Sequence, residues 1–221
     1  MTTAMSAALE LATRITGLIE AGEFPPGTQL SEVALAEELG VSRNTLREAF
    51  RVLARDGLVD HIPNRGVFVH TFTREDVSDL WAYRNFVEVG AVGGAETGTE
   101  RFRACLARMS AAFADARAGV AARDWQAVGT ANNAFHQAIV DLAGVRRLSA
   151  DAHNALALAR IGFLSTNPDS AFHEPYVEMN GRLLELLEAG ELEAAAEFLR
   201  SYFERSQGDL LAQLPKNREV V

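Results

Sequence analysis

Residues 41–59 of the chain have the sequence VSRNTLREAFRVLARDGLV, and this stretch decides the fold of the N-terminal third. We predict a helix over residues 42–56, because Leu46, Phe50 and Leu53 recur at helical spacing and form one apolar face. A helix with one apolar face packs against a small domain and leaves its other side in solvent.

Four arginines lie on one flank of this predicted helix. They fall four residues apart and form a slowly drifting stripe of Arg43, Arg47, Arg51 and Arg55. Ser42 is suited to cap the start of the helix and Gly57 to end it. A guanidinium group offers a planar fork of donors that suits guanine edges and phosphates, so the stripe fits a DNA recognition helix. A solvated charged surface is the alternative.

The elements on either side favour the recognition helix. Upstream, helices are expected over residues 9–21 and 31–38, and a connection of about three residues leads from the second into the arginine helix. Downstream, residues 58–61 and 67–70 predict a two-stranded hairpin with Arg65 at its tip. Three short helices and a basic hairpin define a winged helix-turn-helix, which is a DNA-binding module.

Four segments of this module resemble the DNA-binding domain of the GntR family of bacterial transcription regulators. They are FPPGTQL at 24–30, LAEELGVSR at 35–43, LREA at 46–49 and NRGV at 64–67, and the resemblance extends over about residues 8–71. One departure is the sequence NTL at 44–46, where many members of the family read Thr-Pro-Val. This departure leaves the fold unchanged and alters the expected operator sequence.

The resemblance implies which residues contact DNA. The matching positions are Ser42, Arg43, Asn44, Thr45, Arg47, Arg65 and Gly66. On this basis Arg43 and Arg47 read base edges, and the tip of the hairpin contacts the adjacent groove or backbone. The small polar residues at the start of the helix fix the register through phosphates.

The net charge limits how such a module can bind DNA. The chain has a formal net charge of −9, and residues 1–72 hold six arginines against nine acidic residues, which leaves −3. Because neutralisation of phosphates supplies non-specific affinity, we expect weak, strongly salt-dependent binding to random DNA. Useful affinity then requires a homodimer on a two-part, pseudo-palindromic operator.

The remaining composition indicates a cytoplasmic protein. No run of about 18 apolar residues is present, so no membrane span is expected. Residues 1–8 lack the basic start and the apolar segment of a secretion signal. Cys105 is the single cysteine, which excludes an internal disulfide and suits a reducing compartment.

Beyond residue 72 helical patterns replace strand patterns. Residues 73–76 predict a capping box, and six helices are expected at about 74–96, 99–118, 123–143, 146–165, 172–189 and 191–213, with a break at Asn167-Pro168. Close helix packing is expected at Gly90, Gly93, Gly94 and Gly98. We therefore predict a mainly α chain. It has a winged helix-turn-helix domain over 1–72, an all-α six-helix bundle over 73–214 and a tail over 215–221.

The helical region resembles the FCD effector-binding domain of the FadR-like branch of the same regulators. The matching segments are LWAYRNFVE at 80–88, NNAFHQAI at 132–139 and residues 183–196, and six helices suggest the VanR-like subgroup. The resemblance implies a dimerisation domain that binds a small organic ligand inside the bundle.

Many FCD domains hold a divalent metal with one aspartate and three histidines. The resemblance maps these ligands onto Asn132, His136, Asn180 and Tyr202, so three of the four differ from the family's set. Transition metals prefer imidazole and carboxylate donors, and a tyrosine hydroxyl ionises only near pH ~10. We therefore expect neither a metal nor another cofactor.

The same four positions form a candidate effector site together with Arg84, which the resemblance places at the pocket. A buried arginine requires an anion, so the expected ligand is a carboxylate, and Arg160 is a second candidate cation. Two alternatives remain open. His136 fits an ordinary hydrogen-bonded core residue, and Glu88, one turn after Arg84, fits its internal partner.

The combined expectation is a ligand-responsive DNA-binding transcription regulator, with repression as the family default. The alternative is a constitutive DNA-binding dimer whose helical domain is only structural. An enzyme is not expected, because the sequence places no nucleophile and base, and no paired acids, at a useful spacing.

Overall fold

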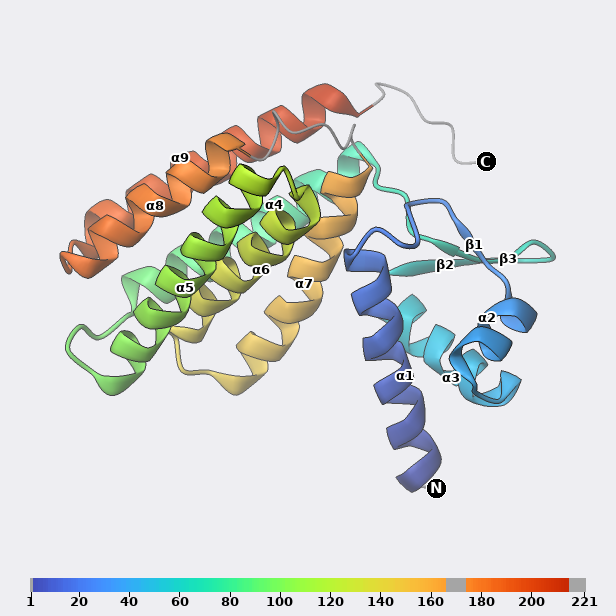
Figure 1. The fold of residues 1–221 in the computed structure, drawn as a ribbon. Coiled ribbons are helices and arrows are strands. Elements are labelled where there is room, and N and C mark those ends of the chain that lie inside the picture. The colour runs from blue at the N-terminus through green and yellow to red at the C-terminus, as the bar shows by residue number, and fades with distance from the viewer. Residues whose placement is uncertain (1, 166–173, 215–221) are drawn as a thin grey trace. The chain divides into compact units, whose positions relative to one another are not determined.

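The computed structural model describes residues 2–165 and 174–214. The predicted tail over 215–221 and the predicted break at Asn167-Pro168 lie outside these residues. The chain divides after Phe72 into two compact units, residues 1–72 and residues 73–221 (Figure 1). Each unit has its own buried core.

The first unit combines three helices with a small sheet. Its elements are α1 (Thr2–Glu20), β1 (Gln29–Leu30), α2 (Glu32–Leu39), α3 (Arg43–Arg55), β2 (Val59–Ile62) and β3 (Gly66–Val69). The sheet has the order β1-β3-β2, and both strand pairs are antiparallel. The prediction of a winged helix-turn-helix is confirmed. The predicted hairpin gains a third strand, β1, which has two residues and is too short to show an alternating pattern.

Capping and burial position α3. The hydroxyl of Ser42 accepts a hydrogen bond at the start of α3, and Gly40 ends α2 in the left-handed conformation with φ of 68°. The glycine turns the chain between the two helices at no steric cost. Leu46, Phe50 and Leu53 are at most 4% exposed, so the predicted apolar face anchors α3 in the core.

The second unit is a bundle of six helices in the part of the chain that the structure describes. They are α4 (Arg74–Gly93), α5 (Glu100–Ala122), α6 (Trp125–Asp141), α7 (Arg146–Leu164), α8 (Glu174–Glu188) and α9 (Leu192–Gln213). Helix α6 packs against α4, α5 and α7, and α9 packs against α4 and α8 (Figure 1). The prediction of a mainly α chain with a six-helix bundle is confirmed. None of the described helices is both long and apolar enough to cross a membrane.

Close packing at glycine occurs at a different place from the one predicted. A Cβ on Gly90 or Gly93 would meet no atom within 4 Å, because both residues are exposed near the end of α4. The prediction of close packing there is wrong. On α6, by contrast, a Cβ on Gly129 would overlap the guanidinium group of Arg160, so this glycine creates the space that Arg160 occupies.

Candidate DNA interface and buried polar cluster

The arginine flank of α3 faces solvent. Arg43, Arg47, Arg51 and Arg55 are all exposed. The Arg47 and Arg51 side chains are 57% and 75% exposed, whereas the opposite face of α3 is buried. The geometry that a recognition helix needs is therefore present. The contacts of these residues with bases and phosphates stay predictions.

Three arginines of the flank have carboxylate partners. The ion pairs are Arg47–Glu32 at 2.8 Å, Arg51–Glu48 at 2.6 Å and Arg55–Asp56 at 2.8 Å. Because solvent screens exposed pairs of this kind, they add little to stability, and their larger effect is to reduce the positive potential of the flank. This reduction fits the weak non-specific DNA binding expected from the net charge.

Polar residues predicted to contact phosphates lie at the start of α3. The Ser42 hydroxyl accepts a hydrogen bond from the Thr45 backbone N–H at 3.1 Å, and the two hydroxyl oxygens are 2.8 Å apart. The Asn44 side chain beside them is exposed. Ser42 and Thr45 thus order the helix start, while Asn44 presents its amide to solvent.

The tip of the hairpin holds Arg65 in an exposed position. The turn needs left-handed backbone at Asn64, with φ of 62°, and a φ of 111° at Gly66, which glycine adopts readily. Gln29 on β1 donates from Nε2 to the carbonyl oxygen of Arg65 at 2.7 Å. The Arg65 guanidinium lies over the Phe68 ring at 5.8 Å. The unpredicted strand β1 therefore helps to fix the tip.

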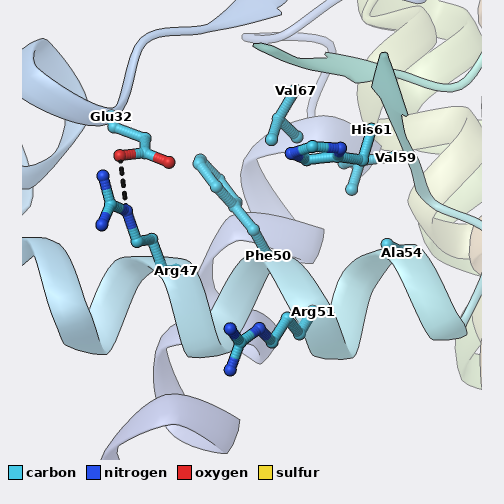
Figure 2. A pocket seen from close by; sticks show the side chains of 8 residues that line it. All are labelled: Glu32, Arg47, Phe50, Arg51, Ala54, Val59, His61 and Val67. Carbon is cyan, nitrogen blue, oxygen red and sulfur yellow. Dashed lines mark hydrogen bonds and ion pairs between the residues drawn. The ribbon is translucent and has the colours of Figure 1, made fainter. Parts of the chain in front are cut away.

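A groove of about 540 Å³ lies between α3 and the hairpin (Figure 2). Its lining residues are Glu32, Arg47, Phe50, Arg51, Ala54, Val59, His61 and Val67. Figure 2 shows the Arg47 side chain rising from α3 to Glu32, with Phe50 between this pair and His61. Sequence reasoning missed the groove because α2, α3, β2 and β3 each contribute residues, and no local pattern links them.

The predicted effector residues gather in the core of the second unit around a carboxylate. Arg84 Nε donates to Glu88 Oε1 at 3.0 Å, and His136 Nδ1 lies 2.5 Å from Glu88 Oε2. All three side chains are at most 3% exposed. The anion that Arg84 requires is thus Glu88, the internal partner that the sequence left as an alternative. That Arg84 also contacts an effector stays a prediction.

The network continues from His136 to two further helices, α8 and α9, and back to Asn132 on α6. His136 Nε2 lies 3.1 Å from the Tyr202 hydroxyl, which lies 3.5 Å from Asn132 Oδ1. Asn180 Nδ2 donates to the same Asn132 oxygen at 2.9 Å. The four positions that the resemblance grouped, on α6, α8 and α9, therefore do meet in space.

The charges in this network are set by burial and by neighbours. Burial alone would raise the pKa of Glu88, but the adjacent His136 and Arg84 outweigh burial and hold this pKa below its ordinary value. Burial lowers the pKa of His136; Glu88 opposes this shift and the charge of Arg84 adds to it. Burial also raises the pKa of Tyr202 far above its usual range. The consistent arrangement has an ionised Glu88, a neutral His136 that donates from Nδ1, and a Tyr202 hydroxyl that donates to Nε2.

Two atoms of the network lack a partner among the described residues. They are Arg84 Nη2, a donor, and Asn180 Oδ1, an acceptor. Nearby, a cavity of about 10 Å³ is lined by Asn132, Arg160 and Tyr202, among others. This volume holds about one water molecule.

The donor set does not fit the metal that many FCD domains hold. Of the four mapped positions only His136 is an imidazole, and both of its nitrogens have hydrogen-bonding partners. The raised pKa of Tyr202 keeps its hydroxyl protonated. Among the described residues no group of three histidine, cysteine, aspartate or glutamate side chains could hold a metal ion.

Two family models match the chain. Residues 7–69 match the bacterial regulatory proteins of the gntR family, and residues 79–205 match the FCD domain. The chain therefore belongs to the GntR family of bacterial transcription regulators and carries an FCD domain.

Similar proteins are regulators of the same kind. A structure from Rhodococcus sp. RHA1, described as a GntR transcriptional regulator, has 36% identity and a TM-score of 0.88, covering 95% of this chain and 100% of that one. LutR, an HTH-type transcriptional regulator of Bacillus subtilis, is 31% identical over 145 residues, which cover 56% of this chain and 62% of LutR. A Paenarthrobacter nicotinovorans protein named "Probable D-xylose utilization operon transcriptional repressor" is 25% identical over 82% of this chain and 78% of its own length. The chain spans less than two fifths of the length of four further curated relatives.

Proposed function

We propose that the first unit, residues 1–72, is a DNA-binding domain that reads an operator in double-stranded DNA. The observation that carries this proposal is the solvent-exposed arginine flank of α3, beside a hairpin with Arg65 at its tip. Arg43 and Arg47 read base edges in the major groove, and Arg65 and Gly66 follow the adjacent groove or the backbone. The residues that fix the register through phosphates are Ser42, Asn44 and Thr45.

The active species in this proposal is a homodimer on a pseudo-palindromic operator. A first unit with a charge of −3 gains little affinity from phosphates alone, so two copies must act together. Two neighbouring aromatic side chains on α4 support a contact between copies, since Tyr83 is 36% and Phe86 84% exposed. Exposed apolar groups that lie together are typical of protein contacts.

The second unit, residues 73–214, is the proposed effector-binding and dimerisation domain, and its effector a small organic acid. The unpartnered atoms Arg84 Nη2 and Asn180 Oδ1 support a ligand, because an unpaired buried polar atom costs about 1–3 kcal/mol. The carboxylate of such an acid would accept a hydrogen bond from Arg84 Nη2, and a hydroxyl or amino group on the same acid would donate one to Asn180 Oδ1. Arg160 at the small cavity is the second cation for its carboxylate, and the polar groups that complete the site are Asn132, His136 and Tyr202.

The proposed route from ligand to DNA runs along α4. This helix carries Arg84 and Glu88 and begins at Arg74, two residues after the first unit ends. A ligand that changes the packing of α4 acts on the connection to the DNA-binding unit. The coupling of such a switch is typically ~1–3 kcal/mol. We propose that the ligand releases the protein from the operator. In the cytoplasm the protein without ligand then stays bound to the operator and represses transcription. The name of the P. nicotinovorans relative supports repression.

A constitutive DNA-binding dimer is the second candidate. The observation that favours it is the internal pairing of the cluster, in which Glu88 neutralises Arg84 beside a cavity that holds about one water molecule. In that case the network of Glu88, His136 and Tyr202 only specifies the packing of the bundle. Both candidates are regulatory and involve no catalysis.

The DNA-binding proposal is tested by selection from a random pool of duplexes with the full-length protein at low salt. Enrichment of an inverted repeat is expected, and enrichment of no sequence would overturn the proposal. The effector proposal is tested by thermal unfolding in a library of small organic acids. An acid present at 100 times its dissociation constant adds about 2.7 kcal/mol of stability. If no acid raises the melting temperature and none releases the selected duplex, the constitutive candidate holds.

A further inference from the structure

The ion pair between Arg47 and Glu32 connects two helices at the proposed DNA interface. Glu32 lies in the first turn of α2 and Arg47 lies on α3. Arg47 Nε donates to Glu32 Oε2 at 2.8 Å (Figure 2). Both residues line the groove together with Phe50.

This pair is too exposed to serve mainly as a source of stability. The side chains are 57% exposed for Arg47 and 33% exposed for Glu32. Exposed ion pairs contribute about 0–1 kcal/mol. A role in the position and charge of Arg47 explains the contact better than a role in folding.

The ion pair with Glu32 leaves the two terminal nitrogens of the Arg47 guanidinium available for contacts with a base. The bond to Glu32 engages Nε on the side of the group, while the two terminal nitrogens point away from Phe50 and His61 in Figure 2. Guanine is recognised by two parallel hydrogen bonds from arginine to O6 and N7, which the terminal nitrogens can supply. Glu32 therefore holds the side chain without occupying the donors that a base requires.

We propose that Glu32 is a positioning residue that sets the DNA specificity of Arg47, an inference that rests on the proposed operator binding. Glu32 fixes the guanidinium before DNA arrives, which spares the loss of side-chain freedom on binding, about 0.5–1.5 kcal/mol for such a group. Its negative charge also opposes phosphates near Arg47. Both effects favour guanine in an operator over the backbone of random DNA.

The pair between Arg51 and Glu48 provides the matched control. It also joins an arginine of the flank to a glutamate, at 2.6 Å, but both residues lie on α3 and are 75% and 51% exposed. Glu32→Gln and Glu48→Gln change the net charge by the same amount. Any difference between the two variants therefore comes from the place of the carboxylate and not from the overall field.

The experiment measures binding of full-length wild type, E32Q and E48Q to the duplex selected by the wild type and to a scrambled duplex, by fluorescence anisotropy. Relative to E48Q, we expect E32Q to lower the ratio of operator affinity to scrambled affinity by about twofold to twelvefold per DNA-binding unit, which is the entropy term above as a fold-change. Selection with E32Q should also lose the preference for guanine at one position of each half-site. Thermal unfolding of each variant serves as the check that the folded fraction is the same at the temperature of the binding assay.

Equal ratios for E32Q and E48Q, with guanine retained, would overturn the inference while the proposed function stands. Failure of the proposed function is a separate result, because the wild type would then select no duplex at all. A third variant, Arg47→Ala, completes the set. If the double variant E32Q/R47A loses no more specificity than R47A alone, Glu32 acts through Arg47; additive losses would show that it does not.

Discussion

Replacement of Glu88 by glutamine tests the buried cluster most directly. Glutamine keeps the shape of the side chain and can still accept from Arg84 Nε, but it removes the only carboxylate that the described residues place against Arg84 and His136. The arginine, at 3% exposure, then keeps its charge in the core without a counter-charge. Removal of one partner of a buried pair costs about 3–5 kcal/mol.

The assay can follow the second unit alone. Both tryptophans of the chain, Trp81 and Trp125, lie in that unit, on α4 and α6. Urea unfolding followed by tryptophan fluorescence should show Glu88→Gln with a free energy of unfolding lower by ~3–5 kcal/mol. At ~2–4 °C per kcal/mol for a chain of this size, the thermal midpoint falls by about 6–20 °C.

A surface variant supplies the control for this experiment. Glu185 on α8 pairs with Arg182, and the two side chains are 66% and 58% exposed, so Glu185→Gln should change the free energy of unfolding by less than about 0.5 kcal/mol. A loss below 1 kcal/mol for Glu88→Gln, about equal to that of the control, would refute the buried, charge-balanced cluster. It would mean that water reaches Arg84.

Four further changes test the remaining features. Lowering the pH from 7 to 5 should destabilise the second unit, because the pKa of buried His136 lies below its unfolded value of 6.5. Between these pH values the unfolded chain binds a proton at His136 more readily than the folded chain does, which favours unfolding. In urea titrations at each pH, His136→Asn should make the free energy of unfolding depend less on pH. Below pH 4.5 the lowered pKa of Glu88 adds a loss of the same sign. Arg47→Ala should weaken operator binding by ~1–3 kcal/mol and relax one base position, and a uniform loss on every duplex would make it a phosphate contact. Phe86→Glu should lower the mass seen by analytical ultracentrifugation from dimer to monomer, and an unchanged mass would remove α4 from the interface. Gly129→Ala should displace Arg160 and abolish any melting shift by an organic acid, with a normal shift arguing against Arg160 as a ligand contact.

The regular elements were predictable because local patterns determine them. The helix expected over 42–56 is α3 at Arg43–Arg55, since an apolar repeat, a serine cap and a following glycine agree within one stretch of chain. The predicted first helix over 9–21 is longer in the structure, where α1 begins at Thr2. Its first residues lack the apolar repeat on which the prediction relied.

The contacts inside the bundle were predictable only in part. Sequence spacing placed Glu88 one turn after Arg84, but it could not decide whether that carboxylate or a ligand would balance the arginine. The deciding contact joins His136 to Glu88 across 48 positions of the chain. Likewise, the space for Arg160 depends on Gly129 on another helix. The spacing of apolar residues along the sequence does not predict which residues of two different helices come into contact.

The acidic character of the chain and its arginine flank are parts of one arrangement. Glu32, Glu48 and Asp56 each balance an arginine of α3, so the flank offers directed donors with little net positive charge. Phosphate neutralisation acts on every sequence alike, whereas directed donors discriminate between bases. We therefore expect this surface to favour specific over non-specific DNA binding. We expect operator binding by the triple variant E32Q/E48Q/R43A to depend less steeply on salt than operator binding by a variant with a lysine added to the same flank. The reason is that only added cations increase the number of counterions released from the DNA.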